Sequence, residues 1–105
     1  MPTPATPPSA ARRALRKLGA DIREARKRRR LSMELLAERA FTSRKTLQRV
    51  EAGDPMVSVG IYASVLHALG LLDGLAMTAD PGTDELGRRL AADALPKRIR
   101  TGDGG

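Results

Sequence analysis

Three serines divide the middle of this chain into short segments that have helical periodicity. A serine directly before a helix caps it, because its side chain accepts a backbone N–H of the first turn. The serines and the segments that follow them are Ser32 (33–40), Ser43 (44–51) and Ser58 (59–69). Gly53 and Gly70 come just after the second and third segments, where glycine commonly ends a helix. No stretch alternates in the manner of a strand, so the sequence predicts an all-α protein that forms one domain at most.

The two ends of the chain differ from this middle part. Residues 1–10 contain four prolines and are predicted to form a disordered arm. A helix is expected from Ala11 onward, where apolar residues form one stripe at Leu15, Leu18, Ile22 and Ala25. A short apolar helix is expected over 71–77, and a last helix over 85–95, ended by Pro96. We therefore expect an arm at 1–10, a helical domain at 11–79 and a tail at 80–105.

Charge is distributed unevenly along the chain, whose formal net charge is +7. Residues 1–50 carry 14 lysine and arginine and four acidic side chains, whereas residues 51–87 carry six acidic side chains and no lysine or arginine. Ten of the basic residues lie between 12 and 30, where they repel one another without a partner of opposite charge. The first half of the chain is therefore expected to bind nucleic acid or another polyanion.

The residue content excludes several classes of site. The chain has no cysteine and a single histidine, so neither disulfides nor a metal site of cysteines and histidines is expected. One tyrosine and one phenylalanine cannot supply the stacking surfaces that read single-stranded nucleic acid. No catalytic constellation is found, so we expect no enzyme, no cofactor and no catalytic residue. Met33, Met56 and Met77 are expected to fill the core.

The sequence has no apolar run long enough to cross a membrane, and its first residues lack the pattern of a secretory signal. A cytoplasmic protein is therefore expected.

Segments 33–40 and 44–51 have the spacing of a helix-turn-helix, in which the second helix projects from the surface. On that second helix Leu47 and Val50 share one side, which is expected to face the core. The side chains expected to point outward are Lys45, Gln48 and Arg49, with Arg44 at the flank. Arginine, lysine and glutamine are the residues that hydrogen-bond the edges of guanine and adenine in the major groove.

These segments resemble the Xre-type (Cro/C1-like) helix-turn-helix domain of bacterial and phage repressors. The resemblance rests on LSMELLAERAFTSRKTLQRVEAG at 31–53 and VLHALGL at 65–71, and it extends over about residues 18–75. It implies a compact, five-helix, lambda-repressor-like domain, followed here by a helical tail. It also implies a sequence-specific regulator of transcription that binds double-stranded DNA, most simply an autorepressor that binds a palindromic operator as a homodimer.

The resemblance also assigns roles to individual residues. Arg44, Lys45 and Arg49 correspond to positions that read bases, and Gln48 is added because it lies on the same outward side. Contacts with the DNA backbone are expected from Ser43, Thr46, Arg16, Lys17 and Arg30. Arg26 is similar to an arginine of the first helix that pairs with a glutamate at the end of the recognition helix, here Glu51.

Four positions depart from the family pattern. Met33 and Leu35 replace a glutamine and a glutamate of the second helix, and Arg30 and Phe41 replace glycines. Phenylalanine adopts a positive φ poorly, so the turn at Phe41 is expected to be rebuilt.

The tail allows two interpretations. It either caps the domain with a frayed helix, or it binds a protein partner through Leu86, Leu90, Leu95 and Ile99. The second layout is similar to that of HipB-like antitoxins, which bind a HipA-like kinase toxin. The alternatives to a sequence-specific regulator are therefore an antitoxin-type interaction module and a nucleoid-type protein without sequence preference.

Overall fold

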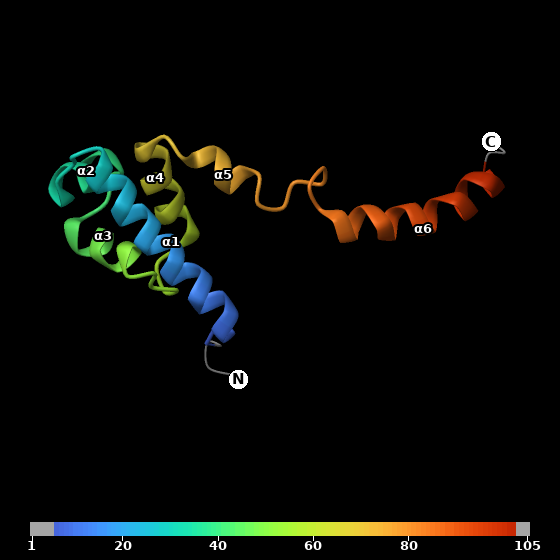
Figure 1. The fold of residues 1–105 in the computed structure, drawn as a ribbon, viewed down its shortest axis with the longest axis horizontal. Coiled ribbons are helices and arrows are strands. Elements are labelled where there is room, and N and C mark those ends of the chain that lie inside the picture. The colour runs from blue at the N-terminus through green and yellow to red at the C-terminus, as the bar shows by residue number, and fades with distance from the viewer. Residues whose placement is uncertain (1–5, 103–105) are drawn as a thin grey trace. The chain divides into compact units, whose positions relative to one another are not determined.

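The computed structural model describes the backbone of residues 6–102 and the side chains of residues 6–94. Figure 1 shows the helices in this part of the chain, and no strand occurs among the residues described. The helices are α1 (Ser9–Arg28), α2 (Met33–Arg39), α3 (Arg44–Glu51), α4 (Val59–Leu69), α5 (Leu72–Ala76) and α6 (Glu85–Gly102). The predicted all-α class is confirmed. The chain divides into two units, Met1–Leu72 and Asp73–Gly105, and each is described here by itself.

The three predicted serine caps are all present. Ser32 accepts the backbone N–H of Leu35 at 3.0 Å, and the side chains of the other two serines accept in the same way. As a result α3 and α4 begin and end at the predicted residues. Helix α1 begins at Ser9, two residues before its predicted start. Pro8 stands at its N-cap, where a missing N–H leaves no helical hydrogen bond unmade.

The first four helices all end in the same backbone motif. At each end a residue with positive φ follows the helix, and the next residue donates its N–H to a carbonyl five residues earlier. The residues with positive φ are Arg30, Phe41, Gly53 and Gly70. Phe41 has a φ of 57°, so the expectation of a rebuilt turn was wrong. The hydrogen bonds of the motif hold a phenylalanine in the conformation that glycine usually adopts.

The core of the first unit receives side chains from four helices. The largest fully buried side chains are Ile22, Leu36, Leu47, Val50 and Val65. They come from α1, α2, α3 and α4 in turn, and each of these helices packs against at least two of the others. Burial of these apolar faces is what fixes the orientation of α3.

Helix α1 crosses the end of α3 at a place that only glycine can occupy. A Cβ on Gly19 would lie 2.6 Å from the backbone oxygens of Val50 and Glu51. A Cβ on Gly53 would in turn lie 2.5 Å from the Cα of Arg16. The two backbones therefore pack directly on each other. Gly19 could not be recognised from the sequence, because a glycine inside a helical pattern gives no sign of the neighbour that it faces.

The second unit contains α6, which begins where Asp84 accepts the backbone N–H of Gly87 at 3.0 Å. Its helix runs to Gly102, so the prediction that Pro96 ends it was wrong. Proline has a helical φ and loses one backbone hydrogen bond, which weakens a helix without always ending it. Among the helices described, none is long and apolar enough to cross a membrane.

The methionines do not fill the core as expected. Met33 is half-buried, whereas Met56 and Met77 are largely exposed. Met56 lies in the turn before α4, from which only the neighbouring Val57 reaches the core. Met77 follows α5, a helix that buries none of its side chains.

Candidate nucleic-acid interface

Helix α3 separates its buried and exposed side chains sharply. Leu47 and Val50 have no accessible surface and hold the helix against α1 and α2. The outward-pointing side chains are Arg44, Lys45, Gln48 and Arg49, and all four are exposed. The structure therefore places the four residues expected to read bases on the solvent side of one short helix. Three of them are cationic and the fourth carries an amide, so this surface presents hydrogen-bond donors to an anionic partner.

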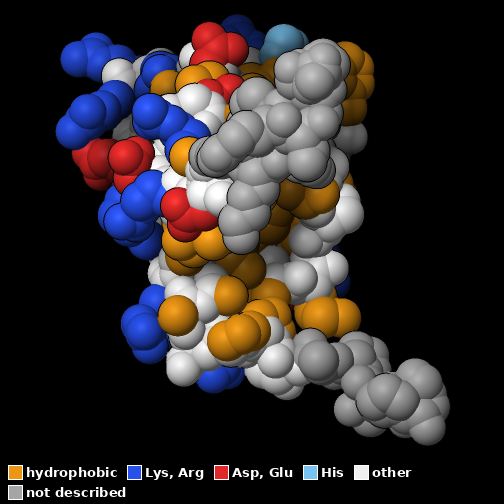
Figure 2. All heavy atoms as spheres, turned by 90° about the vertical axis from the view of Figure 1, so that its right-hand side faces the viewer, with side chains coloured by type: hydrophobic (Ala, Val, Ile, Leu, Met, Phe, Trp, Pro, Cys, Tyr) orange, Lys and Arg blue, Asp and Glu red, His pale blue; other side chains and the backbone are white. Residues whose placement is uncertain are grey.

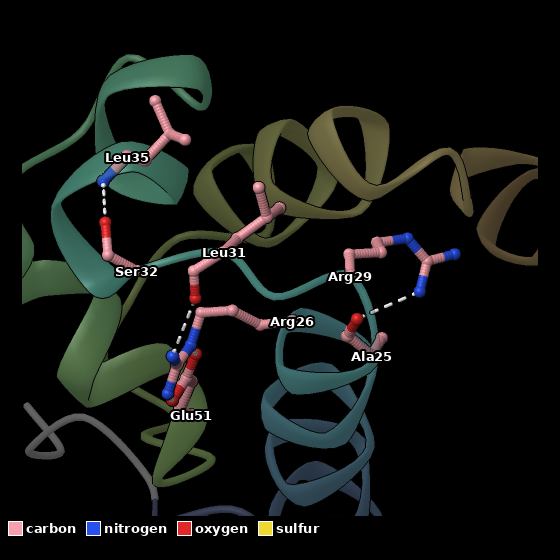
Figure 3. Close-up of polar contacts among 7 residues, drawn as sticks. All are labelled: Ala25, Arg26, Arg29, Leu31, Ser32, Leu35 and Glu51. Atoms are coloured by element: carbon pink, nitrogen blue, oxygen red, sulfur yellow. Dashed lines mark hydrogen bonds and ion pairs between the residues drawn. The ribbon is translucent and has the colours of Figure 1, made fainter.

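The end of α3 is tied to α1 by an ion pair, shown in Figure 3. Arg26 donates from Nε to Glu51 at 2.7 Å and from Nη2 to the other carboxylate oxygen at 3.1 Å. Its Nη1 donates to the backbone oxygen of Leu31 at 3.1 Å. The hydrogen bond that Arg26 donates to Glu51 raises the pKa of Arg26, against the opposing effect of burial. The side chains of Arg26 and Glu51 are only 12% and 7% exposed, so little of the pair is accessible to a ligand.

A second, more exposed ion pair lies where α3 meets the following turn. Arg49 donates from Nε to Oδ2 of Asp54 at 2.7 Å, and the backbone N–H of Met56 donates to Oδ1 of Asp54 at 2.8 Å. These two hydrogen bonds, that of Met56 foremost, hold the pKa of Asp54 below its usual value. Tyr62 donates from its hydroxyl to the backbone oxygen of Asp54 at 2.9 Å, and burial raises the pKa of Tyr62. The turn therefore holds the carboxylate in place from both sides.

Two hydroxyl groups lie at the N-terminus of α3. Ser43 accepts the N–H of Thr46 and donates its own proton to the hydroxyl oxygen of Thr46, each at 3.0 Å. The proton of Ser43 is therefore engaged, while the hydroxyl proton of Thr46 has no acceptor within the described part of the chain and can reach one such as a phosphate oxygen. The N-terminus of a helix also favours a negative charge.

A shallow groove joins α3 to the first two helices. Its walls are formed by Arg23, Arg26, Met33, Arg44, Gln48, Glu51 and Ala52. Met33 stands at the start of α2 and is half-buried. Arg44 lies 3.5 Å from Glu34, and both side chains are mostly exposed. Arg23 was not among the predicted backbone contacts, because the helical pattern alone does not show that it faces the same groove as Arg44.

The other predicted backbone contacts lie on α1 and at its end. Arg16 is exposed beside the turn that holds Gly53. Lys17 is exposed and paired with Asp21 at 2.6 Å, and Arg30 is exposed at its left-handed turn. In the view of Figure 2 many lysine and arginine side chains stand out from the surface at the left. These cations are therefore placed to meet a partner without any rearrangement of the core.

The residues expected to bind a protein partner lie on α6. Leu86 and Leu90 are about three-fifths exposed, with values of 60% and 59%. The side chains of Leu95 and Ile99 lie outside the described residues. Glu85 pairs with Arg88 at 3.3 Å, and the side chain of Asp84 caps the helix.

Comparison with known proteins adds one finding. Residues 6–77 match the family model of a helix-turn-helix domain, which is more than half of the chain. No curated protein matches the chain, and no solved structure does so either. The matched range contains α1, α2, α3 and α4 in full, together with the groove and the three ion pairs of α3.

Proposed function

Because the chain belongs to the helix-turn-helix domain family, we propose that it is an Xre-type regulator that binds double-stranded DNA in a sequence-specific manner. The observation that carries the proposal is the single exposed face of α3, with Arg44, Lys45, Gln48 and Arg49 directed away from a closed core. Such a helix fits the major groove, where these side chains hydrogen-bond base edges. The protein then acts on the nucleoid, in the bacterial cytoplasm.

In this arrangement a second set of residues binds the phosphate backbone. Thr46 donates its free hydroxyl proton at the N-terminus of α3, with Ser43 holding it in place. Arg23 joins the predicted Arg16, Lys17 and Arg30 because it lines the same groove as Arg44 and Gln48. Contacts of this kind set the register of the protein on the duplex and carry no sequence information.

We further propose that two copies bind a palindromic operator upstream of the protein's own gene. An α3 of eight residues reaches only a few base pairs, so one copy reads a short half-site. Two half-sites one helical turn apart give the selectivity that a single copy lacks.

A fluorescence-anisotropy titration at about 150 mM salt tests the proposal. It compares DNA from immediately upstream of the gene with a scrambled duplex of equal length. A preference of about 10³ or more, together with a stoichiometry of two chains per operator, supports an autorepressor. Equal, weak and strongly salt-dependent binding to both duplexes contradicts sequence specificity and indicates a nucleoid-type protein instead.

A second function is favoured by the exposed leucines of α6. Leu86 and Leu90 lie four residues apart and so share one side of the helix. We propose that this side binds a protein partner, a HipA-like kinase toxin in the antitoxin interpretation. The test is co-purification of such a kinase with the full chain and with a chain that lacks residues 81–105. Loss of the complex with retained DNA binding supports two separate functions, and an unchanged complex contradicts a role for α6.

A further inference from the structure

Asp54 is held in place by hydrogen bonds to both its side chain and its backbone. One carboxylate oxygen accepts the backbone N–H of Met56 at 2.8 Å, and the other accepts Nε of Arg49 at 2.7 Å. Its backbone is fixed as well, because its N–H donates to the carbonyl of Arg49 and its own carbonyl accepts the hydroxyl of Tyr62. The carboxylate is therefore a rigid support built on the turn after α3.

Arg49 uses only one of its nitrogens on this support. Its Nε is bound to Asp54, while Nη1 and Nη2 make no hydrogen bond to any side chain or backbone atom that the structure describes. The side chain of Arg49 is 46% exposed, compared with 27% for that of Asp54. Nε of the guanidinium is thus occupied, and nearly half of the Arg49 side chain remains accessible to solvent.

We propose that Asp54 is a positioning residue for Arg49, which it holds so that Nη1 and Nη2 present two parallel donors to a guanine in the major groove. The assignment rests on the proposed function of α3 in reading DNA. Guanine offers two acceptors, O6 and N7, on one edge, and a planar arginine fork binds both together. An arginine that is already oriented gives up less side-chain freedom when it binds, so the correct base gains more from the contact.

The ion pair of Arg44 with Glu34 lacks the rigid support that Asp54 gives to Arg49. Arg44 and Glu34 approach to 3.5 Å, and both side chains are more than half exposed, at 58% and 71%. Neither carboxylate oxygen of Glu34 accepts a hydrogen bond within the described part of the chain. Glu34 therefore supplies a nearby negative charge without fixing the direction of Arg44, and it provides a matched control.

The variant Asp54→Asn should disturb the orientation of Arg49 while keeping the fold of the turn. Asparagine keeps Oδ1 for the N–H of Met56, but it places an amide nitrogen, itself a donor, where Nε of Arg49 needs an acceptor. The variant also removes a negative charge beside the DNA, and Glu34→Gln does the same without breaking a short hydrogen bond. A difference between the two variants thus isolates the orientation of Arg49.

The experiment is selection of binding sites from a pool of random duplexes, with the full chain as wild type, D54N, E34Q, R49A and the double variant D54N/R49A. We expect the wild type to select a guanine at one position of each half-site. In D54N the preference for that guanine should be about tenfold weaker, while random DNA is bound at least as tightly as by the wild type. E34Q should raise affinity for all duplexes and keep the selected sequence. In the R49A background, D54N should change no preference.

The other possible results contradict either the proposed function of α3 or the positioning role of Asp54. A wild type that selects no sequence contradicts the proposed function and this assignment together. A selective wild type whose motif is unchanged in D54N contradicts the assignment alone, as does an effect of D54N that persists without Arg49.

A second measurement covers the case in which D54N does not fold. In the wild type the Nε–H of Arg49 should give a resolved ¹⁵N NMR signal that survives binding of the selected duplex. Loss of that signal on binding overturns the assignment, because the support would then be released when the base is read.

Discussion

Arg30 and Phe41 adopt a left-handed backbone conformation that glycine would hold without strain. Their φ angles are 55° and 57°, and a residue with a Cβ loses about 1–2 kcal/mol in this region. Neither residue compensates through burial, since both side chains are exposed and that of Phe41 is 95% accessible. Strain at these two turns is therefore a local feature that single substitutions can relieve.

Phe41→Gly is expected to raise the free energy of unfolding by about 1 kcal/mol, because the strain exceeds the entropy that glycine adds to the unfolded chain. Urea denaturation followed by circular dichroism measures the change. Phe41→Ala is the control, since it removes the ring and keeps the Cβ. An equal gain in both variants would attribute the effect to the exposed ring and contradict the argument from φ.

Glu51→Gln is expected to lower the free energy of unfolding by about 1.5–3 kcal/mol, because it removes the charged partner of the part-buried Arg26. Thermal or chemical denaturation gives the value. Lys17→Ala provides the comparison, since it breaks an exposed ion pair with Asp21 and should change stability by less than about 1 kcal/mol. Similar losses in the two variants would show that burial does not set the strength of these pairs.

At the scale of the elements, the crossing of α1 and α3 depends on the absence of one side chain. Gly19→Ala should lower the free energy of unfolding by about 1–3 kcal/mol, because the new methyl group meets backbone oxygens that cannot move aside. Gly60→Ala on α4 has space, with its nearest neighbour at 3.7 Å, and should stabilise by about 0.5–1 kcal/mol. Denaturation of both variants should therefore give changes of opposite sign, and a neutral Gly19→Ala would contradict the close crossing.

The sequence predicted the elements that depend on local signals. Ser32, Ser43 and Ser58 cap helices through neighbours three residues away, so their effect can be recognised without knowing the fold. The exposed face of α3 followed in the same way from the positions of Leu47 and Val50.

Features that depend on distant neighbours could not be predicted in this way. The contact made by Gly19 and the groove position of Arg23 arise from packing between helices. The turn at Phe41 was predicted wrongly because the tendency of one residue type was given more weight than the hydrogen bonds of the whole turn. The continuation of α6 through Pro96 was missed for a related reason, since proline lowers the stability of a helix without setting its end.

At the scale of the whole molecule, the proposed function predicts that the excess of positive charge governs the affinity of the chain for DNA. Arg16→Ala should weaken binding to operator and scrambled duplexes equally, and lower the slope of log affinity against log salt concentration by about 1. Titrations between about 50 and 200 mM salt measure that slope. Arg28→Ala is the control, because Arg28 lies about three turns further along α1, points about 120° away from Arg16 around the helix axis and is paired with Glu24. An unchanged slope for Arg16→Ala would remove Arg16 from the backbone contacts.

The close crossing at Gly19 and the pair of Arg26 with Glu51 join α1 to α3 at two separate points along α1. Two attachment points prevent one helix from turning without the other. A spectroscopic label at Ala10, in the first turn of α1, therefore lies about 14 Å along the helix from the crossing and turns together with α3. The orientation of a label on α1 therefore reports the orientation of α3. It allows the angle of α3 on a bound duplex to be measured from a site that does not itself touch the bases.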